Sequence, residues 1–116
     1  MNFMKKAMAK QVSRTRAAYE NMLQMLAPYG KKELCRLMGI GYGGFFEDNC
    51  DLEISCPTLL IIGEKDITGK VKAYNKAWSK NTGFPLVTIP NAAHNSNIDN
   101  PKAVNKAIEE FIASIG

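Results

Sequence analysis

Hydrophobic residues near the start of the chain recur at helical spacing. Between residues 4 and 26 they approximate a helical stripe, and polar or charged residues fill the other face. Pro28 and Gly30 end the pattern, because proline and glycine commonly follow the last turn of a helix. We therefore predict one helical stretch before Pro28.

A second, shorter helix is predicted after Gly30. Its apolar side is formed by Leu34, Leu37 and Met38, and Gly39 ends it. Glycine favours neither helix nor strand, and residues 39–44 are rich in it. This segment is predicted to be a loop.

Two short apolar runs in the second part of the chain are typical of strands. Residues 58–62 lie between Pro57 and Gly63, which is the pattern of a strand buried on both faces in a parallel sheet. Residues 86–89 form a second such run, which Pro90 ends. Both runs are short enough to be strands rather than helices.

A helix is predicted after each strand. The first carries apolar residues at helical spacing, at Val71, Tyr74 and Trp78. Gly83 and Pro85 end it, and Asn100 followed by Pro101 is typical of an N-cap and first turn. The last helix has an amphipathic stripe formed by Val104, Ile108, Phe111, Ile112 and Ile115.

The order strand, helix, strand, helix predicts an α/β fold class. Two strands joined in this way lie parallel, with a right-handed crossover between them. A buried parallel strand needs neighbours on both sides and cover on both faces, which two strands supply poorly. We therefore predict a helical segment at residues 1–54 and a βαβα part at residues 55–116 that belongs to a larger sheet.

Length and composition fit one globular domain. The chain has 116 residues, of which 46% are hydrophobic and 22% charged. Its net charge is +4, and five cations precede the first acidic residue: Lys5, Lys6, Lys10, Arg14 and Arg16. No aromatic residues interleave with these cations, so a solvated helix face is favoured over nucleic-acid binding.

The cysteines exclude some classes of site. Cys35, Cys50 and Cys56 have no C-x-x-C spacing, which argues against a disulfide framework and a zinc site, and we expect no cofactor. Reduced thiols suit the cytosol, and Cys35 is expected in the core. No apolar run approaches the ~20 residues of a membrane span, and no secretory signal is present, so we expect a soluble cytoplasmic protein without a membrane partner.

Polar residues follow both predicted strands. Glu64, Lys65 and Asp66 come after the first, and His94 lies in a polar loop after the second. The carboxyl ends of parallel strands share one edge of a sheet, so these loops should meet. His94 is the only histidine, and a carboxylate beside it would fix its tautomer for proton transfer. Asp66 is the first choice for that partner; a solvated turn histidine is the alternative.

Two segments resemble parts of the α/β-hydrolase family. Residues 56–66, CPTLLIIGEKD, resemble the strand and turn that present the acid of the catalytic triad. Residues 89–94, IPNAAH, resemble the turn that presents its histidine, and the helix after Asn100 resembles the closing helix. The resemblance implies that Asp66 and His94 are catalytic and that the substrate is a small ester or related carbonyl compound. It also implies that residues 1–54 correspond to a helical cap.

The family's nucleophile is missing from the sequence. The chain contains no G-x-S-x-G elbow and no H-G-G-G segment for an oxyanion hole. Residues 39–43 have the outline of the elbow with Gly41 in place of serine, but no strand pattern precedes them. The resemblance therefore implies a truncated hydrolase, inactive alone, whose N-terminal half a separate chain would supply.

Other functions stay open at this stage. A non-catalytic assembly or binding module derived from a hydrolase would use its unpaired strand edge, and a homo-oligomer would cover the sheet. A nucleotide-binding βα domain is disfavoured because no phosphate-binding loop is present. Three methionines, Met22, Met25 and Met38, either line a substrate pocket or pack in the core.

Overall fold

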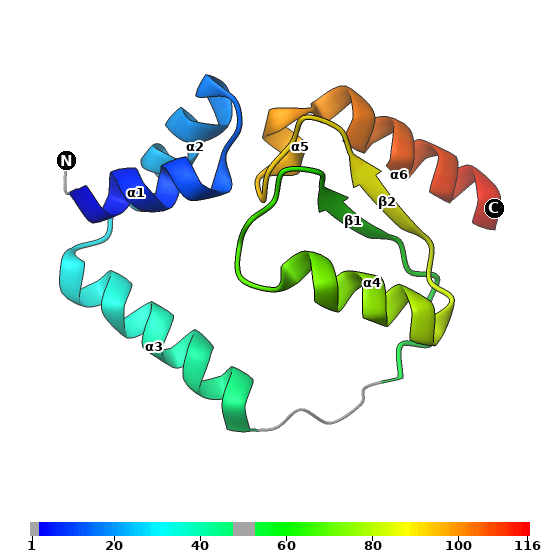
Figure 1. The fold of residues 1–116 in the computed structure, drawn as a ribbon, viewed down its shortest axis with the longest axis horizontal. Helices are drawn as coiled ribbons and strands as arrows, with labels where there is room; N and C mark the ends of the chain where they lie inside the picture. Colours follow the sequence, from blue (N-terminus) through cyan, green and yellow to red (C-terminus); the bar gives the residue numbers. More distant parts are fainter. Residues whose placement is uncertain (1–2, 48–52) are drawn as a thin grey trace.

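The computed structural model of the protein describes residues 3–47 and 53–116 (Figure 1). Its elements in chain order are α1 (Phe3–Val12), α2 (Arg16–Leu26), α3 (Lys31–Glu47), β1 (Leu60–Gly63), α4 (Val71–Thr82), β2 (Leu86–Ile89), α5 (Ser96–Asp99) and α6 (Pro101–Ile115). The division into residues 1–54 and 55–116 stays a prediction. Cys50 lies outside the described residues.

The first predicted helical stretch is two helices, α1 and α2. Thr15 has extended backbone angles (φ −101°, ψ 161°), and its hydroxyl accepts a 3.1 Å hydrogen bond from the amide of Ala18. This N-cap satisfies a backbone donor that would otherwise be unpaired, so a helix begins there although the apolar spacing runs on. The side chains of Ala9 and Ala18 are fully buried in this helix pair.

The predicted end of the next helix at Gly39 is wrong, as is the predicted loop at residues 39–44. Helix α3 continues to Glu47. Glycine costs a helix about 1 kcal/mol relative to alanine but does not forbid it. None of the glycines in this stretch has a positive φ, so the backbone runs through them in the helical conformation.

The expectation that Cys35 belongs to the core is also wrong, because its side chain is exposed. Helix α3 buries the neighbouring Leu34 instead, and Leu37 and Ile40 are exposed.

Among the helices of residues 3–47 and 53–116, none has both the length and the apolar character required to cross a bilayer.

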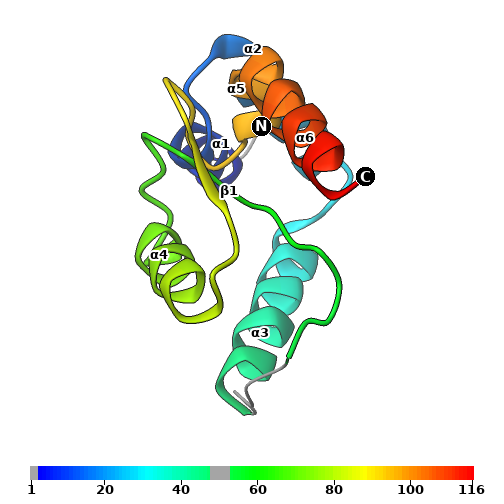
Figure 2. The same cartoon turned by 90° about the vertical axis from the view of Figure 1, so that its right-hand side faces the viewer.

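The predicted parallel strands are present. In the register of the sheet, Leu60 lies opposite Leu86 and Gly63 lies opposite Ile89. Strand β2 has the predicted bounds, whereas β1 begins later than predicted and includes Gly63. Helices α4 and α6 lie on opposite faces of this two-stranded sheet (Figures 1 and 2). The α/β fold class is thus confirmed at the level of a small parallel sheet with helices on both faces.

The predicted helix ends of the βαβα part are confirmed. Gly83 ends α4 in the left-handed conformation (φ 77°), which glycine adopts without strain. The Asn100 side chain accepts a hydrogen bond from the amide of Ala103, and Pro101 occupies the first turn of α6. Gly83 thus sets where the chain leaves α4 toward β2, and Asn100 sets where α6 begins.

The core of the described chain is small. One cluster joins Ile89, Ala92 and Val104, but α6 leaves the outer part of its apolar stripe in solvent, with Ile112 58% exposed. A sheet of two strands is too narrow to cover a helix of this length. The Cα radius of gyration is 16.0 Å, against about 13 Å for a compact domain of this size. The chain therefore presents uncovered apolar surface around its sheet.

Candidate acid–base site

The loops that follow the two strands run side by side. The amide of Glu64 donates to the carbonyl of Ile89 (2.9 Å), and the amide of Lys65 donates to the carbonyl of Ala92 (2.8 Å). The Glu64 carboxylate accepts a 3.0 Å bond from the amide of Asn91. These bonds bring the polar residues after both strands to one edge of the sheet.

Asp66 is the buried acid of this edge. It is 4% exposed, and its Oδ1 accepts a 2.8 Å hydrogen bond from the amide of Thr68. Burial is the largest single influence on the pKa of Asp66 and raises it, but hydrogen bonds from Thr68 and His94 together outweigh burial, so the pKa is lowered. Asp66 is consequently a carboxylate at neutral pH and can only accept hydrogen bonds.

The structure places His94 directly beside Asp66. The ring Nδ1 of His94 lies 2.9 Å from Oδ2 of Asp66. Because an ionised carboxylate cannot donate, Nδ1 must carry the proton of this hydrogen bond. When the ring is neutral, Nε2 then has the free lone pair and can accept a proton. The His94 side chain is 46% exposed, so this nitrogen is accessible to a reactant.

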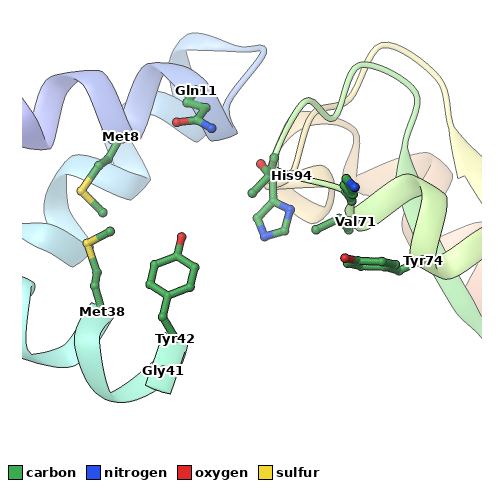
Figure 3. Close-up of a pocket in the computed structure, with 11 residues that line it drawn as sticks. Met8, Gln11, Met38, Gly41, Tyr42, Val71, Tyr74 and His94 are labelled. Carbon is green, nitrogen blue, oxygen red and sulfur yellow. The ribbon is translucent and has the colours of Figure 1, made fainter. Parts of the chain in front are cut away.

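A pocket of about 660 Å³ opens in front of His94 (Figure 3). Its walls come from α1, α3, the turn after Asp66 and the start of α4, and the residues that give it its character are Met8, Met38, Tyr42, Val71 and Tyr74. In Figure 3 the side chains of Met8 and Met38 point toward each other, and the Tyr42 hydroxyl points into the space between these methionines and His94. The pocket is mainly apolar.

Of the three methionines considered as pocket residues, one lines the pocket. Met38 lines the pocket, whereas Met22 and Met25 do not. Met8, which lies within the apolar stripe of residues 4–26 and for which no role was predicted, is the second methionine of the pocket. The helical spacing does not distinguish Met8 from Met22, because whether Met8 lines the pocket depends on how α1 lies relative to His94.

Sequence reasoning missed the role of Gly63. A Cβ atom added there would lie 2.1 Å from the carbonyl oxygen of Ala93 and 2.5 Å from that of Ala92. The His94 loop therefore passes directly over the end of β1, at a distance that only glycine permits. A glycine that ends a strand is a signal for such an approach, although not for which segment makes it.

The role of Asp99 was not predicted from the sequence either. The Asp99 carboxylate accepts hydrogen bonds from Arg14, Thr15 and Ala93. Two of these partners lie more than 80 positions earlier in the chain. No local pattern in the sequence could have indicated them.

No nucleophile is joined to the pair in the described part of the chain. There the ring of His94 has Asp66 as its hydrogen-bond partner, and no serine, threonine or cysteine side chain is bonded to it. Residues 3–47 and 53–116 also contain no group of three or more histidine, cysteine, aspartate or glutamate side chains placed to hold a metal ion. The described residues therefore place His94, oriented by Asp66, beside an apolar pocket.

Compared with protein-family models, curated proteins and solved structures, the chain matched none of the three. The resemblance of residues 56–66 and 89–94 to α/β-hydrolases therefore stays a prediction from the sequence.

Proposed function

We propose that this chain provides the acid–base part of an α/β-hydrolase that cleaves an ester or a related carbonyl compound. The observation that carries the proposal is the 2.9 Å contact between His94 Nδ1 and Asp66 Oδ2 at the carboxyl edge of a parallel sheet. The acid follows one strand, the histidine follows the next, and one helix lies between them. This is the arrangement that the resemblance of residues 56–66 and 89–94 implies.

In this proposal His94 transfers the protons of acyl transfer. Its Nε2 takes the proton of an attacking serine and later gives it to the leaving group. Asp66 holds the Nδ1 proton and stabilises the imidazolium that forms between these steps. The serine and the oxyanion donors would come from outside these 116 residues, from another segment or another chain. Without oxyanion donors, residues 1–116 would show little or no turnover.

The pocket supports an apolar small-molecule substrate. Its volume of about 660 Å³ falls within the range of small-molecule sites, roughly 300–1,000 Å³. Thioether and aromatic side chains would bind an alkyl or aryl group by burying its surface, and Met is adaptable to different shapes. The carbonyl of such a substrate would then lie near Nε2 of His94.

We expect butyranilide, a stable amide analogue of phenyl butyrate, to bind this pocket. With ¹³C-labelled methionine methyls, the Met8 and Met38 resonances should shift on titration together with the His94 ring. Met25 provides the matched control, since it is 61% exposed and lies outside the pocket. Equal shifts at all methionines, or none at millimolar ligand, would contradict the assignment of the pocket as the substrate site.

A second candidate is a non-catalytic assembly module. The observation that favours it is the exposed outer stripe of α6, formed by Ile108, Ile112 and Ile115. Exposed apolar patches of this kind mark interaction sites, and a homo-oligomer or a separate chain with further strands would cover this one. A molar mass of one chain, measured by light scattering, would exclude the homo-oligomer.

We also propose a cytoplasmic location, which the exposed free thiols of Cys35 and Cys56 suit.

A further inference from the structure

Asp99 joins two parts of the chain that are distant in sequence. Its Oδ1 accepts hydrogen bonds from the amide of Thr15 (2.7 Å) and from the Thr15 hydroxyl (2.9 Å). The amide of Arg14 lies 2.9 Å from Oδ1 and 3.0 Å from Oδ2. Its Oδ2 also accepts from the amide of Ala93 at 2.9 Å. One carboxylate thus holds the corner between α1 and α2 and the loop that carries His94.

The backbone is held on both sides of His94. The amide before it, that of Ala93, donates to Asp99. The amide after it, that of Asn95, donates to the carbonyl of Val12 at the end of α1 (2.8 Å). The Asn95 bond reaches the end of α1 directly, whereas the Ala93 bond reaches the α1–α2 corner through Asp99, which binds Arg14 and Thr15. The position of the His94 backbone therefore depends on where that corner lies.

The partners of Asp99 match the charge state of a carboxylate. Burial is the largest influence on the pKa of Asp99 and raises it, but the amides of Ala93, Thr15 and Arg14 outweigh burial, so the pKa is lowered. All its partners are N–H or O–H donors, which suit an acceptor-only group. An asparagine here would turn its NH₂ group toward a donor in either orientation and lose one of the two connections.

We propose that Asp99 is a positioning residue that couples the docking of α1 and α2 to the alignment of His94 with Asp66. The pair would hold one geometry only while the N-terminal helices are seated on the βαβα part. The pocket depends on the same docking, because α1 supplies Met8 to its wall. This coupling of positions does not depend on catalysis. Its importance for turnover rests on the function proposed above.

The test is the Asp99→Asn variant with ¹⁵N-labelled histidine. In the wild type, the ring nitrogens should report one neutral tautomer with the proton on Nδ1. We expect Asp99→Asn to lose this single tautomer and to show a mixture of both. Glu109→Gln makes the same charge change at an exposed site on α6 and should keep the wild-type tautomer. A folded Asp99→Asn variant that keeps it would overturn the proposal and leave Asp99 a merely structural role.

If Asp99→Asn does not fold, the wild type itself provides the test. In sub-denaturing urea, the Nδ1 tautomer of His94 should be lost at the urea concentration at which the amides of Arg14 and Thr15 lose protection from hydrogen exchange. A tautomer that persists after those amides exchange would refute the coupling. Neither readout needs turnover, so the role of Asp99 is tested independently of the proposed hydrolase function, which itself predicts little or no turnover by residues 1–116 alone.

Discussion

An alanine in place of Gly63 is expected to destabilise the folded chain by about 3 kcal/mol, near the upper end of what overpacking costs. The added Cβ would lie 2.1 Å and 2.5 Å from two backbone carbonyl oxygens, those of Ala93 and Ala92. Backbone atoms cannot rotate away as a side chain does, so β1 and the His94 loop would have to separate. The urea midpoint of the β1 and β2 amides, followed by NMR, measures the effect.

Gly39→Ala is the matched control for this substitution. Apart from its chain neighbours and the nearby backbone of its own helix, no described atom lies within 4 Å of a Cβ added at Gly39, and the residue is helical with no positive φ. Here alanine should stabilise α3 by about 0.5–1 kcal/mol, because glycine loses more conformational freedom on folding. If Gly63→Ala left the sheet as stable as Gly39→Ala does, the close approach of the His94 loop to β1 would be wrong.

The substitution Asp66→Asn is expected to reverse the tautomer of His94. The asparagine oxygen would keep the hydrogen bond from the amide of Thr68, which is 2.8 Å from Oδ1 in the wild type. Its NH₂ group would then face Nδ1 of His94 as a donor, so Nδ1 would give up its proton and Nε2 would carry it. The base would lose the lone pair that faces the pocket. In a completed hydrolase we expect turnover to fall about 10⁴-fold, as in a serine protease triad with the same change.

The ¹⁵N shifts of the His94 ring measure this reversal directly. Glu64→Gln is the control, since Glu64 lies in the same turn and accepts from the amide of Asn91 rather than from the histidine. That variant should keep the proton on Nδ1. A ring that retains its Nδ1 proton in Asp66→Asn would show that Asp66 does not set the tautomer, and the acid–base assignment would fail.

Local signals made much of the βαβα part predictable. Pro90 ends β2, Gly83 ends α4 and Asn100 caps α6, each at its predicted position. The contact of Asp66 with His94 followed from a topological rule, since loops after parallel strands share one edge. What that contact does chemically stays a proposal.

The predictions that were wrong or missing concern segments whose structure is determined by tertiary contacts or by weak local propensities. A hydrogen bond from Ala18 to Thr15 divides a stripe whose spacing predicted one helix. Glycines in α3 lower its helical propensity without ending it, so the predicted stop at Gly39 failed. The bonds of Asp99 could not be predicted, because they depend on how two segments far apart in the chain are placed in space.

The proposed acid–base function is tested most directly by treating the purified, folded chain with a fluorophosphonate, followed by intact mass and peptide mapping. If the proposed function is right, no adduct forms, because Asp66 and His94 would supply only the acid–base part of a triad whose serine would come from outside these 116 residues. A stoichiometric adduct on one serine, abolished by His94→Ala, would contradict it and show that the chain holds its own nucleophile.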